Sequence, residues 1–491
     1  MKKSRETSAP SLKRCFGLWE TITINVGTVI GVGLFTLGAN VVGLLGPWVF
    51  LATLLALGIS IYPSLLYAEM GGALPYAGGT YQYASLGLGR PFGVLAGWNF
   101  IISMVSVASG EALAFAFYLR TLFQALGIPL PIGDRAVACL GLAGFLLLAL
   151  RGVEWSGRLQ NGFLFFFWGV ALVWVCSMAP RLQFSYFTAG PGVTPQGFLP
   201  CVALVWWCFA GFETCCAMGE EIKHPQINLP RALFLAPFLV FAVNGLFQWV
   251  LVCIVPPEGL PALAGAAAPY AKGMELAGVA GFPLILLCLG IAFGGDFSTL
   301  NASVSAPARY LFTMARDGVL PAAFAKVHPK YHTPYVSILA LGALMLLLVS
   351  TGSIDHIASL SLFATLLYYV IGIAAALGLR RRRPDLPRPY RAPLIRLGAP
   401  VSIAVYLLMM TQLEPSGAAM GAAWCVLGLA VCRPGRRSAG PAGSFPPPPL
   451  PPSLDEKAAM DREYRFWRAA VGIAVALVLA LYAVAFLLSK G

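Results

Sequence analysis

The sequence predicts an all-α polytopic membrane protein, and three observations lead to this prediction. The chain has 491 residues, of which 58% are hydrophobic and only 11% carry a charge. Apolar runs of about 20 residues, the length that a helix needs to cross a bilayer, cover most of the chain. The net charge is +13, and the basic residues gather in alternate loops between these runs, which places most of them on one side of the membrane.

Thirteen apolar runs are candidate membrane spans. They are expected at residues 16–45, 47–69, 92–119, 136–150, 159–178, 197–219, 231–255, 279–312, 335–351, 354–379, 395–413, 416–432 and 468–488. The polar, basic stretch before the first run lacks the pattern of a cleaved signal, so we expect the first span to be retained.

The distribution of basic residues predicts the orientation. With a cytoplasmic N-terminus, only five of the 33 Lys and Arg residues fall on the outer side, namely Arg120, Arg135, Arg181, Lys272 and Lys490. This bias predicts a multi-pass protein of the plasma membrane, which in a bacterium is the cell inner membrane. It also explains the positive charge by the lipid bilayer, without a nucleic-acid partner; it says nothing of the oligomeric state.

The order of long and short spans predicts two structural repeats. The third and eighth spans are the long ones, and each is third in a group of five, which divides the chain into repeats at 16–178 and 197–379. Because five is odd, the second repeat enters the membrane from the opposite side. The remaining parts are a cytoplasmic tail (1–15), a basic cytoplasmic loop (380–394), helices 11 and 12 (395–433), a Pro-rich cytoplasmic linker (434–467) and an additional helix 13 (468–488).

Glycines interrupt the first span in the stretch "TINVGTVIGVGLF". Each of Gly27, Gly31 and Gly33 disfavours a continuous helix by about 1 kcal/mol, so backbone groups there are available to a ligand. Close helix packing through Gly27 and Gly31 is the alternative. A matching interruption in the sixth span, "FAGFE" at 209–213, favours a binding site between the two breaks.

Several motifs resemble the amino acid-polyamine-organocation permease superfamily over about Gly17 to Arg383. They are "GTVIGVGLF", "AEMGGALPYAGGTYQYASLGLGRPFGVLAGW", "GVEWSGRLQN", "FAGFETCCAMGEEIKHPQINLPRAL" and "DFSTLNASVSAPARYLFTMARDGVLPAAFAKVHPKYHTP". The resemblance implies a leucine-transporter-type fold with a 5+5 inverted repeat, about 13 transmembrane helices, broken helices 1 and 6, and a substrate held between the breaks.

The resemblance also implies roles for individual residues. The backbone from Thr28 to Gly33 would receive a substrate carboxylate, the carbonyl groups of Phe209 and Ala210 would hold the ammonium, and Phe209 would cover the substrate. Phe212 is either a lid or scaffold packing. The substrate-binding candidates are Gly27, Thr28, Ile30, Gly31, Val32, Gly33, Phe209, Ala210, Gly211, Phe212 and Glu213.

Acidic residues within the spans are functional candidates because charges at membrane depth are costly. Glu213 either pairs with a cationic substrate side chain or joins helices. Many proton-driven members of the superfamily have a lysine in the fifth helix where this chain has Phe167, so a lysine-based mechanism is not expected. The remaining coupling candidates are Asp296, Ser298, Thr299 and Glu111.

The eighth span carries polar residues on opposite faces. Asp296 and Thr299 lie on one face, and Ser298, Asn301 and Arg309 on the other, so we expect a central helix with neither face in lipid. Hydroxyl groups at Ser298 and Thr299 match sodium ligands of related transporters. We nevertheless expect proton-linked or exchange transport, with Asp296 either carrying the proton or only joining helices.

These features predict a secondary active transporter that moves amino acids by alternating access. The alternatives are a membrane sensor or scaffold that binds an amino acid, and a polyamine or amine permease. We expect no enzymatic activity, no cofactor and no metal, because the four histidines, His224, His328, His332 and His356, lie in loops or at span ends without ligand spacing.

The span count makes a prediction about topology. With thirteen spans and a cytoplasmic N-terminus, a tag after Gly491 is expected outside the cell and a tag within the Pro-rich linker inside. Labelling by an impermeant reagent before and after permeabilisation measures both. Labelling of the C-terminal tag only after permeabilisation would refute the count.

Overall fold

The computed structural model describes residues 14–187, 193–352, 354–432 and 451–489. Most of the expected N-terminal tail and the proline run of the linker lie outside these ranges. Helices make up almost all of the ordered backbone, and within the described ranges there is no strand, only isolated bridges between Phe16 and Ile222 and between Ala77 and Met218. The all-α prediction is confirmed.

Helices occur at each of the thirteen expected ranges. In the first half they are α1 (Leu18–Val29), α2 (Ala39–Leu45), α3 (Val49–Ala73), α4 (Gly79–Gly87), α5 (Arg90–Ala125), α6 (Asp134–Arg151) and α7 (Val153–Met178). In the second half they are α8 (Pro195–Trp207), α9 (Pro225–Ile254), α10 (Pro269–Leu276), α11 (Phe282–Gly290), α12 (Phe297–Arg316), α13 (Tyr335–Thr351) and α14 (Ile354–Arg382). Helices α15 (Ile395–Met410), α16 (Pro415–Val431) and α17 (Leu454–Leu488) follow.

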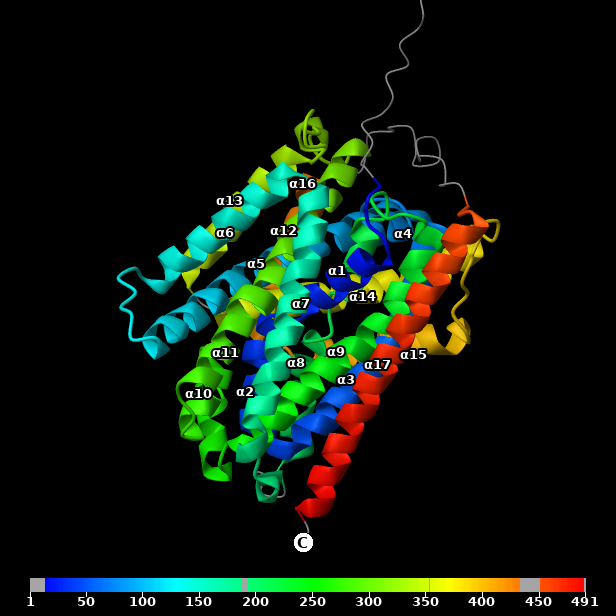
Figure 1. Cartoon of the computed structure of the whole chain (residues 1–491). Coiled ribbons are helices and arrows are strands. Elements are labelled where there is room, and N and C mark those ends of the chain that lie inside the picture. The colour runs from blue at the N-terminus through cyan, green and yellow to red at the C-terminus, as the bar shows by residue number, and fades with distance from the viewer. Residues whose placement is uncertain (1–13, 188–192, 353, 433–450, 490–491) are drawn as a thin grey trace, which may run out of the picture.

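The length and composition of the helices make this a multi-pass membrane protein. Seven helical segments of the described chain are long and apolar enough to span a membrane, and α15 with α16 forms a further candidate that is bent by 118°. The first described residues and the end of α17 lie at opposite ends of the bundle (Figure 1). The count of thirteen spans and the division into two five-helix repeats stay predictions.

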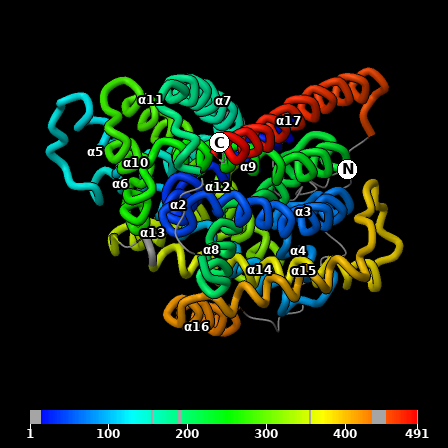
Figure 2. Tube along the Cα trace, turned by 90° about the horizontal axis from the view of Figure 1, so that it is seen from below, coloured from blue at the N-terminus to red at the C-terminus, as the bar shows by residue number. Residues whose placement is uncertain are grey.

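Most residues of α1, α2, α5 and α12 are buried, whereas α16 and α17 lie at opposite edges of the bundle (Figure 2). On α12 and the turn before it, Asp296, Ser298, Thr299, Asn301 and Arg309 are all buried. The prediction that the eighth span is central, with neither polar face in lipid, is therefore confirmed.

Helix α17 docks along α9 through close contacts. The Tyr482 hydroxyl donates to the carbonyl oxygen of Gly245 at 3.0 Å, and the Tyr482 ring stacks on Phe50 of the neighbouring α3 with ring centroids 3.8 Å apart. The Trp249 indole donates to the carbonyl oxygen of Leu481 at 3.1 Å. Near the opposite end of α17, Arg231 of α9 forms an ion pair with Asp461.

The contact between α9 and α17 allows a matched glycine test. A Cβ on Gly245 would lie 2.6 Å from Cγ1 of Val478, whereas a Cβ on Gly472 of α17 would meet open space. We expect Gly245→Ala to destabilise the protein by about 1–3 kcal/mol through overpacking. Gly472→Ala is expected to be neutral or stabilising by up to about 1 kcal/mol. Thermal melting of both variants in detergent measures this, and equal melting temperatures would contradict the docking.

Candidate functional site

The first helix is interrupted where the glycines predict. Helix α1 ends at Val29, Ile30 departs from helical geometry with ψ of 79°, and a π-helical turn over Gly33–Gly38 leads into α2. The interruption releases carbonyl groups toward α12. The Thr299 hydroxyl lies 2.7 Å from the Gly27 carbonyl oxygen and 3.1 Å from that of Ile30, so both carbonyls face one side-chain donor.

A backbone N–H group is released at the same interruption. In a continuous helix the Val32 N–H would donate to the carbonyl of Thr28, four residues earlier. Here it donates to Oε1 of Glu111 on α5, at 2.6 Å. The close approach requires Gly31, since a Cβ there would lie 2.1 Å from the same carboxylate oxygen.

The second interruption follows α8. Gly211 has φ of 104°, a left-handed conformation that favours glycine, and its N–H donates to the Tyr369 hydroxyl at 3.1 Å. A Cβ on Gly211 would lie 3.1 Å from Cγ2 of Thr28, so the two interruptions are in contact. Within the described chain, no hydrogen bond reaches the carbonyl oxygens of Phe209 and Ala210.

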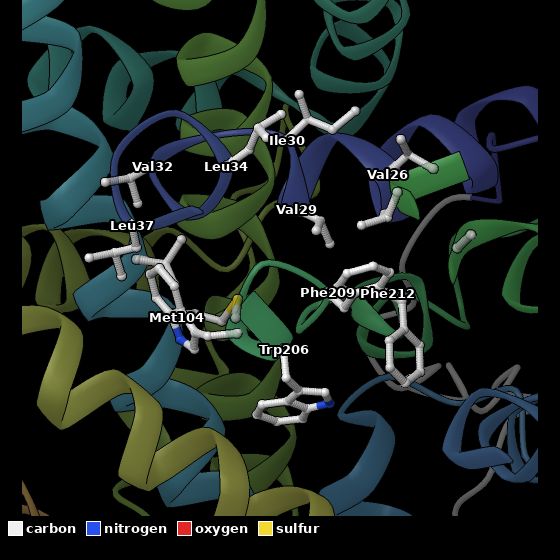
Figure 3. Close-up of a cluster of buried hydrophobic side chains, with 14 of the residues drawn as sticks. Val26, Val29, Ile30, Val32, Leu34, Leu37, Met104, Trp206, Phe209 and Phe212 are labelled. Carbon is white, nitrogen blue, oxygen red and sulfur yellow. The ribbon is translucent and has the colours of Figure 1, made fainter. Parts of the chain in front are cut away.

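A small cavity lies between the two interruptions, α5 and α14. Its lining consists of Thr28, Val29, Val32, Gly33, Ser103, Met104, Val107, Glu111, Trp207, Ala210 and Thr365. Figure 3 shows three of these side chains, Val29, Val32 and Met104, of which Val29 lies toward Phe209 of the second interruption. The cavity volume of about 20 Å³ has room for about one water molecule, so a substrate requires the helices to move apart.

The lining agrees with part of the predicted site. Thr28, Val32, Gly33, Ala210 and Glu111 were predicted from the sequence and line the cavity. Seven predicted substrate-binding residues are buried but are not part of the lining, namely Gly27, Ile30, Gly31, Phe209, Gly211, Phe212 and Glu213. In this conformation the aromatic residue against the cavity is therefore Trp207 and not the expected Phe209.

Several lining residues were missed by the sequence analysis. Ser103, Met104 and Val107 lie on the same face of α5 as Glu111, because they precede it by eight, seven and four residues. The predicted role of Glu111 would therefore have identified all three from the sequence. Trp207 lies two residues before the predicted Phe209. Thr365 on α14 carries no such local signal, because only the packing of α14 against α5 brings it to the cavity.

Glu213 is held by hydroxyl groups away from the cavity. The Tyr368 and Tyr369 hydroxyls of α14 both donate to its carboxylate, and the side chain is buried. Phe212 packs between the rings of Tyr67 and Tyr369, with centroid distances of 6.2 and 5.5 Å. This geometry favours the scaffold interpretation for both residues.

A side-chain network joins the interrupted helix to α7 and α12. The Gln160 amide donates to the Ser298 hydroxyl at 2.7 Å and to the Thr23 carbonyl at 3.0 Å, and it accepts from the Asn301 amide at 2.7 Å. Together with Thr299, these amide and hydroxyl groups give the carbonyls of Thr23, Gly27 and Ile30 and the Ser298 hydroxyl hydrogen-bond donors within the protein.

Two buried acids lie next to each other beside the cavity. Asp296, at the end of the π-helical turn before α12, and Glu111 of α5 lie close enough to interact directly. Phe167 of α7 packs against the π-helical turn that ends at Asp296. A Cβ added to Gly294 in this turn would lie 2.6 Å from the Cβ of Phe167. No group of three His, Cys, Asp or Glu side chains in the described ranges is arranged to hold a metal ion.

The end of the bundle where the described chain begins is closed. Arg14 donates to the carbonyl oxygens of Gly219 and Ile222 at 3.0 and 2.8 Å. Buried Glu221 accepts from Arg309 of α12 at 3.1 Å, and its carbonyl accepts from the backbone of Cys15 at 2.8 Å. The segments next to both interrupted helices are thus tied to α12 at this end.

Two interrupted helices around a closed central cavity define a membrane transporter of the broken-helix class. Comparison with known proteins gives the family: residues 16–432 match the family described as amino acid permease, so the chain belongs to the amino acid permease family. This agrees with the superfamily resemblance of the sequence motifs.

Individual relatives are transporters. The chain is 26% identical over 442 residues to the branched-chain amino acid permease BcaP of Bacillus subtilis, covering 86% of this chain and 92% of the relative. It is 30% identical over 435 residues to an uncharacterized transporter of Mycobacterium tuberculosis, covering 87% and 92%. Cationic amino acid transporter 4 of Mus musculus is 28% identical over 409 residues, covering 79% and 62%.

The two glycines of the first interruption are expected to differ. A Cβ on Gly31 would collide with Glu111, whereas a Cβ on Gly33 would have its nearest neighbour, Cα of Cys208, at 3.4 Å. We expect Gly31→Ala to weaken amino acid binding by about tenfold or more and Gly33→Ala to change it much less, although a bulky Leu at either position would block the site. Binding of a panel of labelled amino acids to the purified, folded variants measures this. Unchanged binding by Gly31→Ala would contradict the assigned site.

Proposed function

We propose that this protein is a secondary active transporter that moves amino acids across the plasma membrane by alternating access. The observation that carries the proposal is the pair of interrupted helices, in which Val32, with its released N–H, and Ala210, with a carbonyl free of hydrogen bonds in the described chain, line one cavity, and the free carbonyl of Phe209 is next to Ala210 in the chain. An N–H donor suits a carboxylate and free carbonyl groups suit an ammonium, which are the two groups that all α-amino acids share. Membership of the amino acid permease family supports the same function.

The cavity lining supports a neutral, apolar amino acid as substrate. Val29, Val32, Met104, Val107 and Trp207 provide most of the surface that a substrate side chain would contact. The one acid in the lining, Glu111, is engaged by the Val32 N–H. A polyamine would need further acids, and the lining has none. The branched-chain specificity in the name of one relative agrees with this substrate class.

The hydrogen bonds at the interruption support proton-linked transport or exchange and argue against sodium symport. Thr299 faces the carbonyls of Gly27 and Ile30, and Gln160 occupies Ser298, so a sodium ion would have to displace established donors. Asp296 is the proposed proton carrier, since it is buried beside the cavity and lies next to a second acid. The N-terminus is proposed to be cytoplasmic.

Uptake of L-leucine by proteoliposomes tests this proposal. We expect accumulation under an imposed pH gradient, or counterflow against internal leucine, and no response to a sodium gradient. Asp296→Asn is expected to lower pH-driven accumulation by about tenfold or more, because the buried proton site is lost. The matched control Asp385→Asn lies in an exposed loop and is expected to behave as the wild type.

Three outcomes would count against the proposal. Accumulation driven by sodium alone would contradict the coupling. Unchanged pH-driven accumulation in Asp296→Asn would remove that residue as the proton carrier. Leucine binding without uptake or counterflow would favour a sensor instead of a transporter.

A further inference from the structure

The carboxylate of Glu111 already occupies a carboxylate-binding position. Its Oε1 accepts from the Val32 N–H at 2.6 Å, and the side chain is 1% exposed. Its second oxygen, Oε2, has no hydrogen-bond partner within the described chain. The carboxylate is therefore held at the helix interruption by one backbone donor.

The Val32 N–H is also the donor to which the proposed function assigns the substrate carboxylate. Val32 directly precedes the π-helical turn over Gly33–Gly38, so the N–H lies at the positive end of the following helical segment. A single N–H cannot serve two carboxylates in this narrow cavity, and two ionised carboxylates in contact would repel each other. Substrate and Glu111 must compete for it.

We infer that Glu111 is an internal substitute for the substrate carboxylate, which an arriving amino acid displaces toward Asp296. This inference rests on the proposed function and names the event that links substrate to proton. Both carboxylate oxygens of Asp296 are buried and lack a hydrogen-bond donor in the described ranges, so they can accept from a protonated Glu111.

The surroundings of the two acids determine what happens to the displaced carboxylate. Helix α5 itself contributes Tyr118, whose hydroxyl donates to the carbonyl of Phe35 at 2.7 Å. The other titratable groups on that side are Tyr270 and Cys288, beside Tyr118. None of these groups supplies a positive charge. Two carboxylates in contact there cannot both stay ionised, so the pair already shares one proton before substrate binds. Displacement removes the Val32 N–H that stabilises the remaining negative charge, and no positive group replaces it, so Glu111 and Asp296 take up one further proton.

Proton uptake on substrate binding gives a measurable pH dependence. If one proton binds with each leucine, the dissociation constant for leucine rises by about tenfold for each pH unit. Isoamylamine is leucine without its carboxylate, so it does not compete for Val32 and its binding takes up no proton. Titration calorimetry on the wild-type protein between about pH 6 and 8, in buffers of different ionisation enthalpy, measures both quantities.

The variant Glu111→Gln distinguishes two roles of Glu111: competition with the substrate carboxylate for the Val32 N–H, and a purely structural role at the helix interruption. Glutamine keeps the length of the side chain and an oxygen for the Val32 N–H, but its displacement requires no proton. We expect leucine affinity that does not depend on pH in this variant. The matched control Glu275→Gln, on the exposed face of α10, is expected to keep the wild-type slope. If Glu111 only stabilised the helix interruption, Glu111→Gln would bind leucine more weakly at every pH, and the dissociation constant would still rise with pH as in the wild type.

Each outcome decides the inference. A retained slope in folded Glu111→Gln, or equal proton uptake with leucine and isoamylamine in the wild type, would overturn it. Should Glu111→Gln not fold, the wild-type comparison of the two ligands decides alone. Leucine that binds with a pH-independent dissociation constant would overturn the inference and leave the proposed function intact, whereas no leucine binding at any pH would contradict both.

Discussion

A helix that breaks inside a bilayer finds no water for the N–H and C=O groups that it releases, and this constraint governs the centre of the structure. Every released group must find a partner in the protein or in a ligand. Thr299 faces the carbonyls of Gly27 and Ile30, and Glu111 accepts from the Val32 N–H. The carbonyls of Phe209 and Ala210 have no such partner in the described chain, and for this reason we propose them as partners of the substrate ammonium.

The same constraint explains why α12 is polar and central. Its hydroxyl and amide groups reach α1 and α7, and its Arg309 reaches buried Glu221 at the closed end of the bundle. A buried polar helix of this kind can tie both interruptions together only as long as each donor keeps its acceptor. A movement that opens the cavity must therefore exchange these hydrogen bonds for others, and under the proposed function the carboxylate and ammonium of an amino acid take part in that exchange.

Helix α17 stands apart from this polar centre. The family match ends at residue 432, before α17 begins, and the helix lies at one edge of the bundle (Figure 2). Besides its ion pair and hydrogen bonds with α9, it makes aromatic contacts, with Tyr482 on Phe50 and Trp467 on Trp19 of α1, where the ring centroids of the latter pair are 4.7 Å apart. Because Trp19 precedes the first interruption on the same helix, α17 restrains the part of α1 that faces the closed end.

The sequence by itself determined the all-helical class, the two interruptions and the buried eighth helix, because run length, glycine spacing and helical faces are properties of neighbouring residues. Only the tertiary structure decided that Trp207 and not Phe209 meets the cavity, that Tyr368 and Tyr369 hold Glu213, and that Glu111 reaches Val32. Glu111 and Val32 are 79 positions apart. Their hydrogen bond depends on how α5 packs against a broken helix, and no local pattern encodes such a contact.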